Sequence, residues 1–366
     1  MSTLTNASFQ KLNALQALRG LAFIGVICEH TRLIETGAFS VSIFFVLSGF
    51  LMTYSYYHRS IKSSFLSGIN LAWNKISKLY PLHIITLIAA IPFRIESSNE
   101  IFTIEFTKKF FLNLFLLQSW SPDPNIHFSF NAVSWYLSTS VLLYIMFPFI
   151  YKLLKRYTNY LHAYAGIVFA LVIQILFAFL TRNIGTDSFF IKEFSKWFTY
   201  IFPLFRLGDF FIGCNLGYLF LSRKTDISHV STTLLELLTC LLSAFVLFLY
   251  NKKISIGEIE WIRYTLLFTV CSLLLIYLFA SEQGYISKLI TTKLLIYIGN
   301  ISSYGFIIHS TIIRVINKFF LTPYAYIFSP LNLTILTLIL TCILCTLIAQ
   351  LPKLFSASLI KKQSNC

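Results

Sequence analysis

Charged side chains are scarce in this chain. Asp, Glu, Lys and Arg together make up 12% of its 366 residues, about half the share of an average soluble domain. Hydrophobic residues make up 57% of the chain. They lie in blocks of about 17–22 residues, the length that crosses the hydrocarbon core of a bilayer. The scarcity of charge therefore excludes a soluble globular domain and predicts an integral membrane protein.

Acidic residues are fewer than basic residues. The chain has 14 Asp and Glu against 29 Lys and Arg, for a net charge of +15. Nucleic-acid-binding proteins carry such an excess on a basic stripe or patch, but no basic stripe alternates with aromatic residues here. The Lys and Arg residues instead lie at the ends of the hydrophobic blocks, as topology signals do. We therefore expect a lipid bilayer as a partner and no nucleic acid.

Several familiar catalytic and ligand-binding patterns are also missing. The chain has no Gly-rich phosphate loop and no Gly-x-Ser-x-Gly motif. Its seven Cys residues show no metal-like spacing, so we expect no bound metal and no permanently bound cofactor. Residues 1–11 are polar and lack a small-residue cleavage site, so we expect no cleaved signal peptide.

The hydrophobic blocks predict an all-α fold, a single polytopic membrane helix bundle over residues 1–366 with about ten transmembrane helices. The predicted spans are 14–31, 39–57, 79–95, 132–151, 160–181, 203–221, 232–250, 262–280, 301–320 and 331–352. A shorter block at 104–119 is interpreted as a re-entrant or interfacial helix. With the N-terminus inside and this block not crossing, the inner segments carry roughly twice as many Lys and Arg as the outer segments. Both termini are therefore predicted to be cytoplasmic.

Arg19 and His30 are the most informative residues of the first block. Eleven residues separate them, which is three helical turns plus about 20°, so both side chains leave one helix face about 16 Å apart. Ionisable residues are costly to bury in a membrane and often mark a functional site. His30 is the predicted base, because imidazole titrates near neutrality and can take a proton from a hydroxyl. The alternative is that both side chains reach the headgroups, as we expect for Glu29.

Lys75 and Lys78 are predicted to share a helix face at the cytoplasmic mouth of the third span, because they lie three residues apart. Two interpretations have equal weight. The two cations bind the phosphates of a nucleotide-bearing donor, or they anchor the helix end as topology signals.

Small and aromatic residues provide three further candidates. Ser48 precedes Gly49 in the second span, where the favoured interpretation is close packing of another helix. Trp135 and Ser138 open the fourth span, where an aromatic belt at the outer interface is the alternative to a site.

Three charged or titratable candidates lie later in the chain. Arg206 and Asp209 are three residues apart at the start of the sixth span, a spacing that favours an ion pair. His309 lies inside the ninth span, where it either bonds a neighbouring helix or lines a site.

Together these stretches resemble the acyltransferase-3 family of polytopic bacterial membrane O-acyltransferases. The matching positions are Leu18-Arg19-Gly20 with His30, the block Phe44–Phe50, Lys75 and Lys78 with Pro81, Arg206 and Asp209 with Phe210, Gly213 and Gly217, and Ser302 to His309. Departures from the family pattern are Lys for Arg at 75 and 78, Asp for Glu at 209, Ser140 in place of a Glu, and Ser303 and Phe306 in place of Tyr.

The resemblance implies an O-acetyltransferase of the bacterial inner membrane, with acetyl-CoA as donor and a glycan or glycolipid as acceptor. The acceptor would be a hydroxyl of an envelope or exported polysaccharide such as capsule, lipopolysaccharide or exopolysaccharide. It implies His30 and Arg19 as catalytic residues, Arg19, Lys75 and Lys78 as CoA-binding residues, and Ser48, Trp135, Ser138, Arg206, Asp209 and His309 as supporting site residues. Direct transfer and an acyl-enzyme relay both remain open, as does a homo-oligomer. The alternative function is a transporter or flippase of a glycan intermediate, which would share the same spans.

Overall fold

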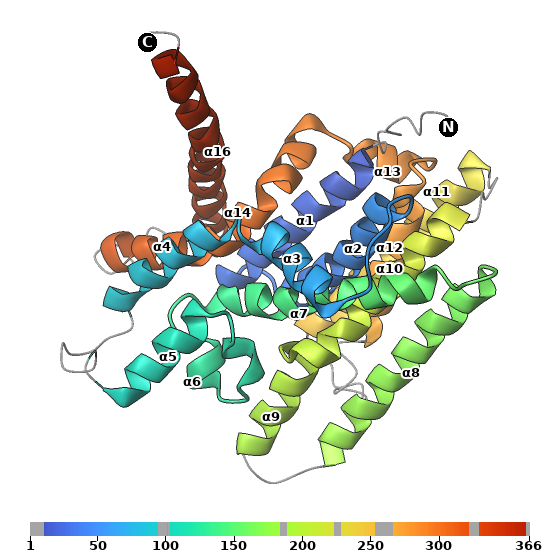
Figure 1. Ribbon diagram of the computed structural model, residues 1–366, viewed down its shortest axis with the longest axis horizontal. Helices are drawn as coiled ribbons and strands as arrows, with labels where there is room; N and C mark the ends of the chain where they lie inside the picture. Colours follow the sequence, from blue (N-terminus) through green and yellow to red (C-terminus); the bar gives the residue numbers. More distant parts are fainter. Residues whose placement is uncertain are drawn as a thin grey trace.

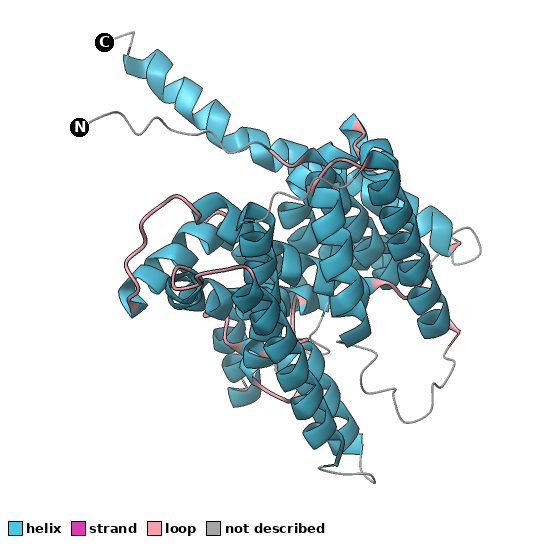
Figure 2. Cartoon of the chain, turned by 90° about the vertical axis from the view of Figure 1, so that its right-hand side faces the viewer, coloured by secondary structure: helices cyan, strands magenta, loops and turns pink. Residues whose placement is uncertain are grey.

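The computed structural model describes residues 11–93, 101, 103–183, 189–222, 228–252, 266–321 and 329–363. In this part of the chain the structure consists of helices and the loops between them, without strands (Figures 1 and 2). Residues 1–10 and the ends of two predicted spans, 94–95 and 262–265, lie outside the described residues.

The main helices follow one another along the whole described chain. They are α1 (Asn13–His30), α2 (Gly37–Tyr56), α3 (Phe65–Ile76), α4 (Tyr80–Ala90), α5 (Ile104–Leu114), α6 (Pro124–His127), α7 (Trp135–Leu154), α8 (Leu161–Asn183), α9 (Phe189–Tyr200), α10 (Pro203–Ser222), α11 (His229–Asn251), α12 (Phe268–Ala280), α13 (Tyr285–Ile290), α14 (Lys293–Ile316) and α16 (Pro330–Gln363). The predicted all-α bundle is confirmed.

Six helical stretches of the described chain are long and apolar enough to cross a membrane. They are Gly37–Tyr56, Ala132–Leu154, Leu161–Thr181, Glu193–Ser222, His229–Asn251 and Pro330–Gln350. The helices α3 and α4 form a bent pair that makes a seventh if it is one span. Helix α1, the first predicted span, is not among these six. It carries Arg19, Glu29 and His30, which lower its mean hydropathy. The protein is therefore polytopic, and the number of about ten crossings stays a prediction.

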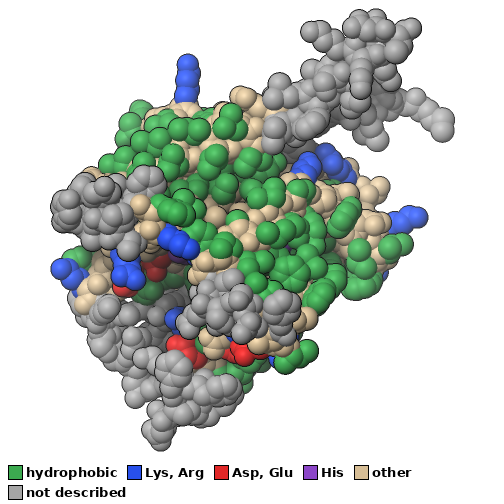
Figure 3. All heavy atoms as spheres, turned by 90° about the vertical axis from the view of Figure 1, so that its left-hand side faces the viewer, with side chains coloured by type: hydrophobic (Ala, Val, Ile, Leu, Met, Phe, Trp, Pro, Cys, Tyr) green, Lys and Arg blue, Asp and Glu red, His purple; other side chains and the backbone are tan. Residues whose placement is uncertain are grey.

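The outer helices present apolar faces. In each of α8, α11 and α16, only 28% of the most hydrophobic 18-residue stretch is buried, against 83% in α2. Figure 3 shows hydrophobic side chains over a broad central area of one face, with charged side chains around its margins. This distribution fits helices that contact lipid around a central helix α2.

The third predicted span, 79–95, begins at a break between two helices. Helix α3 ends at Ile76, and α4 begins at Tyr80 with Pro81 in its first turn, at an angle of 64° between the two helices. The first turn of a helix accepts Pro, because the N–H that Pro lacks would have no helical partner there. Pro is disfavoured in a helix interior, so α3 does not continue through Pro81. Lys78 lies in the turn between them, so the expectation that Lys75 and Lys78 share a helix face is wrong.

Helix α5 occupies the block that was predicted not to cross. It contains 11 residues, which is about 16 Å of helix, roughly half the thickness of the hydrocarbon core. The following loop is fixed from within the bundle, since Ser138 of α7 donates a hydrogen bond to the carbonyl oxygen of Leu116 at 2.6 Å. This agrees with a re-entrant or interfacial helix over 104–119.

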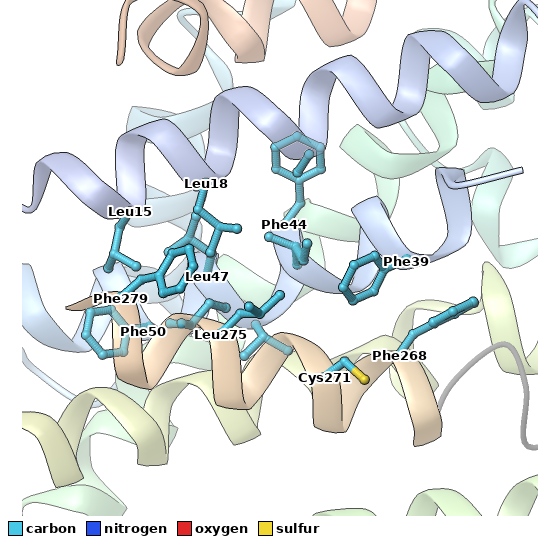
Figure 4. Close-up of a cluster of buried hydrophobic side chains, with 14 of the residues drawn as sticks. Leu15, Leu18, Phe39, Phe44, Leu47, Phe50, Phe268, Cys271, Leu275 and Phe279 are labelled. Carbon is cyan, nitrogen blue, oxygen red and sulfur yellow. The ribbon is translucent and has the colours of Figure 1, made fainter. Parts of the chain in front are cut away.

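Small residues bring the central helices into backbone contact. A Cβ atom on Gly49 of α2 would collide with the carbonyl oxygen of Phe210, and one on Gly213 of α10 with that of Val46. The predicted close packing of another helix is thereby confirmed at Gly49. Figure 4 shows the cluster on another face of α2, where Leu15 of α1, Phe44 and Leu275 of α12 lie among other buried side chains.

Candidate active site

A cavity of about 420 Å³ opens between α1, α2, α3, α7 and α14. We call it the Arg19 cavity. Its charged lining residues are Arg19 and Lys75, and no carboxylate is found among the described residues that line it. Its hydroxyl groups belong to Ser48, Ser55, Tyr136, Ser140, Tyr144, Ser302 and Ser303. A cavity with two cations and many hydroxyl donors is suited to an anionic group such as a phosphate.

The position of Arg19 follows from the close contact of α1 with α14. A Cβ atom on Gly20 would collide with the carbonyl oxygen of Leu295, and one on Gly299 with that of Gln16. At this short separation the guanidinium of Arg19 donates a hydrogen bond from Nη2 to Oγ of Ser303. Ser303 is one of the departures from the family pattern, and in this chain its hydroxyl orients Arg19.

Of the two predicted lysines, the structure brings only Lys75 to the Arg19 cavity. Lys75 belongs to the last turn of α3 and lines the cavity. Lys78 is exposed in the turn after α3 and is not among the lining residues. The break between α3 and α4 places Lys78 in the turn and outside the lining of this cavity.

A second cavity of about 210 Å³ surrounds the end of α1. We call it the His30 cavity. Its polar side chains are Glu29, His30 and Lys196. Its aromatic side chains are Phe128, Trp135, Tyr200 and Phe306. Aromatic faces combined with a few polar groups are typical of small-molecule sites. Trp135 is therefore a buried cavity residue here and not part of an aromatic belt.

Glu29, expected at the membrane interface, has a defined hydrogen-bond partner in the structure. Its Oε2 accepts a hydrogen bond from the backbone N–H of Gly37 at 3.1 Å. Gly37 is the first residue of α2, so the carboxylate satisfies a free donor at a helix N-terminus. The sequence signal that was missed is the short connection after His30, which returns the chain to within reach of the preceding turn.

Two side chains separate the cavities. Val133 and Phe306 line both of them, and we call these two residues the partition. The ring of Phe306 lies between Phe44 and Tyr136, with centroid distances of 5.8 and 4.9 Å. The Arg19 cavity and the His30 cavity are therefore neighbours along α1.

His309 is brought directly to His30. Its Nε2 lies 3.3 Å from Nδ1 of His30. His309 is fully buried, whereas His30 is exposed at the end of α1. Nothing in the local sequence around either residue predicts this contact, because it depends on how α1 packs against α14.

Arg206 and Asp209 form the predicted ion pair and line neither cavity. Nη1 of Arg206 lies 2.7 Å from Oδ2 of Asp209, and both side chains are fully buried. The hydrogen bonds that Asp209 accepts at Oδ1 come from Gln174 and Thr269, both at 2.9 Å. Nε of Arg206 donates to the carbonyl oxygen of Tyr200 at 2.7 Å. The pair thus supports the wall of the His30 cavity from behind Tyr200.

The remaining candidates divide between cavity and scaffold. Ser48 lines the Arg19 cavity. Ser138 lines neither cavity and hydrogen-bonds the loop after α5, with Oγ of Ser119 at 2.6 Å. Ser140, in place of the family's Glu, lines the Arg19 cavity and donates to the carbonyl oxygen of Tyr136 at 2.8 Å. Among the described residues no group of three or more His, Cys, Asp or Glu is placed to hold a metal ion.

Comparison with known proteins connects this geometry to a family. A model of the acyltransferase-3 family, described as an acyltransferase domain, matches residues 12–350. The chain belongs to the acyltransferase-3 family. Acyltransferase MdmB of Streptomyces mycarofaciens is 33% identical over 122 residues, which are 33% of this chain and 30% of that protein. The match thus spans less than a third of the relative, and no solved structure matches the chain.

Family membership and the hydrophobic helices make this chain a polytopic member of a family of acyltransferases. Such an enzyme needs an acyl donor and an acceptor, and two neighbouring cavities are available for them. The family match over nearly the whole chain favours an acyltransferase over the alternative of a transporter or flippase.

Proposed function

We propose that this acyltransferase moves an acetyl group from cytoplasmic acetyl-CoA to a hydroxyl group of an envelope or exported polysaccharide at the bacterial inner membrane. The observation that supports this proposal is the pair of neighbouring cavities along α1. One contains two cations and the other contains an imidazole among aromatic side chains. Acetyl-CoA acts as a substrate, and the mechanism needs no permanently bound cofactor.

The Arg19 cavity is the proposed donor site. Arg19 and Lys75 bind phosphate groups of CoA through charge-assisted hydrogen bonds, which are about twice as strong as neutral ones. The acetylated end of the donor then extends along α1 towards the partition. Because Arg19 and His30 are about 16 Å apart along the helix, the cations hold the distant part of the donor and not its reacting carbonyl group.

The His30 cavity is the proposed acceptor site. The Nδ1 atom of His30 lies 2.8 Å from the carbonyl oxygen of Val26, which only accepts hydrogen bonds. Nδ1 therefore carries the proton of the neutral ring, and Nε2 is left with its lone pair. Glu29 and Lys196 supply polar contacts to an acceptor sugar, and Trp135 and Tyr200 supply apolar faces.

We propose direct transfer between the two sites. Nε2 of His30 takes the proton of the acceptor hydroxyl as its oxygen attacks the thioester carbonyl carbon. The new ester C–O bond forms, the C–S bond breaks, and CoA leaves as a thiolate. Protonated His30 then returns the proton to this sulfur, so the enzyme ends in its starting state.

The test uses the full chain purified into lipid nanodiscs, with radiolabelled acetyl-CoA and surface glycan from the host. Replacing His30 with Ala should lower acetyl transfer by about 10²–10⁴, the usual contribution of a general base. His162→Ala is the control, because His162 is exposed on α8 and lines neither cavity. Wild-type transfer by His30→Ala would exclude His30 as the base. An unchanged acetyl content of the host's surface glycan after deletion of the gene would exclude the acceptor class.

The proposed orientation, with both termini in the cytoplasm, has its own test. In a background without Cys, Lys62→Cys between α2 and α3 should react with a membrane-impermeant thiol reagent only from the cytoplasmic side. Lys252→Cys after α11 should react only from the other side. Both lysines are exposed. Labelling of both positions from one side would overturn this topology.

A further inference from the structure

The contact between His30 and His309 has a defined hydrogen-bond direction. Nδ1 of His309 lies 3.0 Å from the carbonyl oxygen of Gly305, one helical turn earlier in α14. A carbonyl oxygen only accepts, so Nδ1 of His309 carries the proton. In the neutral ring Nε2 of His309 is then an acceptor, and it points at Nδ1 of His30 at 3.3 Å.

Nδ1–H of His30 therefore has two acceptors, the carbonyl oxygen of Val26 at 2.8 Å and Nε2 of His309 at 3.3 Å. Both acceptors require the proton on Nδ1, so both favour the same tautomer of His30. The ring centroids of the two histidines are 4.9 Å apart, and the ring planes meet at 69° in an edge-to-face arrangement. The lone pair on Nε2 of His30 is the part of the ring that remains for chemistry.

We infer that His309 is a positioning residue for His30. This inference rests on the proposed function. His309 fixes the orientation of the His30 ring and, in the neutral ring, favours the tautomer that leaves the lone pair on Nε2. After Nε2 has taken the acceptor's proton, His309 accepts the hydrogen bond from a charged imidazolium, which is stronger than one from a neutral ring.

The surroundings of His309 set this role apart from ordinary core packing. The ring is fully buried, with the rings of Phe23 and Phe306 at centroid distances of 6.0 and 5.9 Å. An apolar ring would fit among these neighbours without burying a polar nitrogen, which costs free energy unless it is hydrogen-bonded. The hydrogen bond of Nε2 in the described structure is the one with His30.

Two substitutions at this position separate positioning from packing. His309→Phe keeps a ring of similar shape and removes the acceptor. His309→Gln removes the ring and keeps an acceptor, because its amide oxygen reaches about as far as Nε2. We expect His309→Phe to lower kcat for acetyl transfer by about 10- to 100-fold, the loss typical when the hydrogen-bond partner that orients a metal-binding His is removed. The KM for acetyl-CoA should stay within about twofold, and His309→Gln should recover most of kcat.

A packing role predicts the opposite order, with Phe tolerated better than Gln. Wild-type kcat in His309→Phe, or an equal loss in both variants, would overturn the inference. If His309→Phe gives little folded protein, a double-mutant cycle with His30→Ala is measured on the fraction that folds, and it tests the inference. When His309 acts through His30, His309→Gln and His309→Phe have the same residual activity in a His30→Ala background. A difference that persists without His30 contradicts the positioning role.

Failure of this inference can be told from failure of the proposed function. Wild-type protein is assayed for release of free CoA thiol and for acetylated glycan in the same samples. If the wild type produces neither, the proposed function fails. If the wild type transfers acetyl and His309→Phe transfers it equally fast, only the positioning role fails.

Discussion

Arg19 and His30 lie on one helix and one face of it, and yet they line two different cavities. Helix α1 therefore contributes a cation to the proposed donor site and an imidazole to the proposed acceptor site. The acyl group has to pass the partition, Val133 and Phe306, to move from the first cavity to the second. The Arg19 cavity, the His30 cavity and the partition thus have different proposed roles, and mutations can test each role separately.

The first prediction concerns the two lysines near the donor site. Lys75→Ala should raise the KM for acetyl-CoA about tenfold with little change in kcat, because a charge-assisted hydrogen bond contributes about 1.5–3 kcal/mol to binding both ground and transition states. Lys78→Ala is the matched control, since Lys78 carries the same charge in the same segment but does not line the cavity. Equal effects in steady-state kinetics, normalised to folded protein, would return both lysines to the role of topology signals.

The second prediction concerns the shape of the cation at position 19. Arg19→Lys conserves charge but loses the planar fork of donors and the hydrogen bond to Ser303. We expect kcat/KM for acetyl-CoA to fall by about tenfold. Ser303→Ala should have a smaller effect, because it leaves the guanidinium in place and removes only one of its contacts. Wild-type kcat/KM in Arg19→Lys would mean that position 19 contributes charge alone.

The third prediction concerns the buried ion pair. Asp209→Ala leaves Arg206 charged and unpaired in a fully buried position, and such a loss destabilises a protein by about 3–5 kcal/mol. The Tm of the protein in detergent should fall strongly. Glu105→Ala is the control, because it removes an ion pair between exposed Glu105 and partly buried Lys109, and ion pairs at the surface contribute about 0–1 kcal/mol. A stable Asp209→Ala protein without activity would place Asp209 in catalysis and not in the scaffold.

The sequence predicts those features of this protein that depend on neighbouring residues. Hydrophobic blocks specify the helices, a spacing of three specifies the pair of Arg206 and Asp209, and small residues at Gly49 and Gly213 specify a close helix contact. Even the break before α4 has a local signal, Pro81, although the expectation that Lys75 and Lys78 share one helix face did not use it.

Tertiary contacts decide the features that the sequence does not predict. Glu29 caps α2 because the chain turns back after His30. His30 and His309 are 279 residues apart and meet only because α1 packs against α14. Lys75 lines the Arg19 cavity and Lys78 does not, because α3 ends before Lys78. The partition is equally unpredictable, because Val133 and Phe306 come from different parts of the chain. In a membrane protein, the sequence near a hydrophobic residue does not show which residues it contacts.

The partition provides the last prediction, on the size of the acyl group. Because Val133 and Phe306 line both cavities, a smaller side chain at either position should widen the route between them. In Phe306→Leu we expect the ratio of kcat/KM for butyryl-CoA to that for acetyl-CoA to rise by about tenfold, since one or two methylene groups in a pocket change discrimination by about 10- to 200-fold. Val133→Ala should shift the ratio in the same direction.

Two controls separate this effect from a loosened core. Phe306→Tyr keeps the ring and should leave the ratio unchanged. Phe220→Leu makes the same change on α10 in contact with Phe50, away from both cavities, and should alter Tm without altering the ratio. Replacing a buried aromatic ring with a smaller side chain destabilises the surrounding structure wherever the ring lies. Loss of activity alone therefore does not distinguish a widened route from a loosened core, whereas the ratio of kcat/KM for butyryl-CoA to that for acetyl-CoA does. If that ratio stays constant in both Phe306→Leu and Val133→Ala, the acyl group does not pass between these two side chains, and the donor carbonyl reaches His30 by another route.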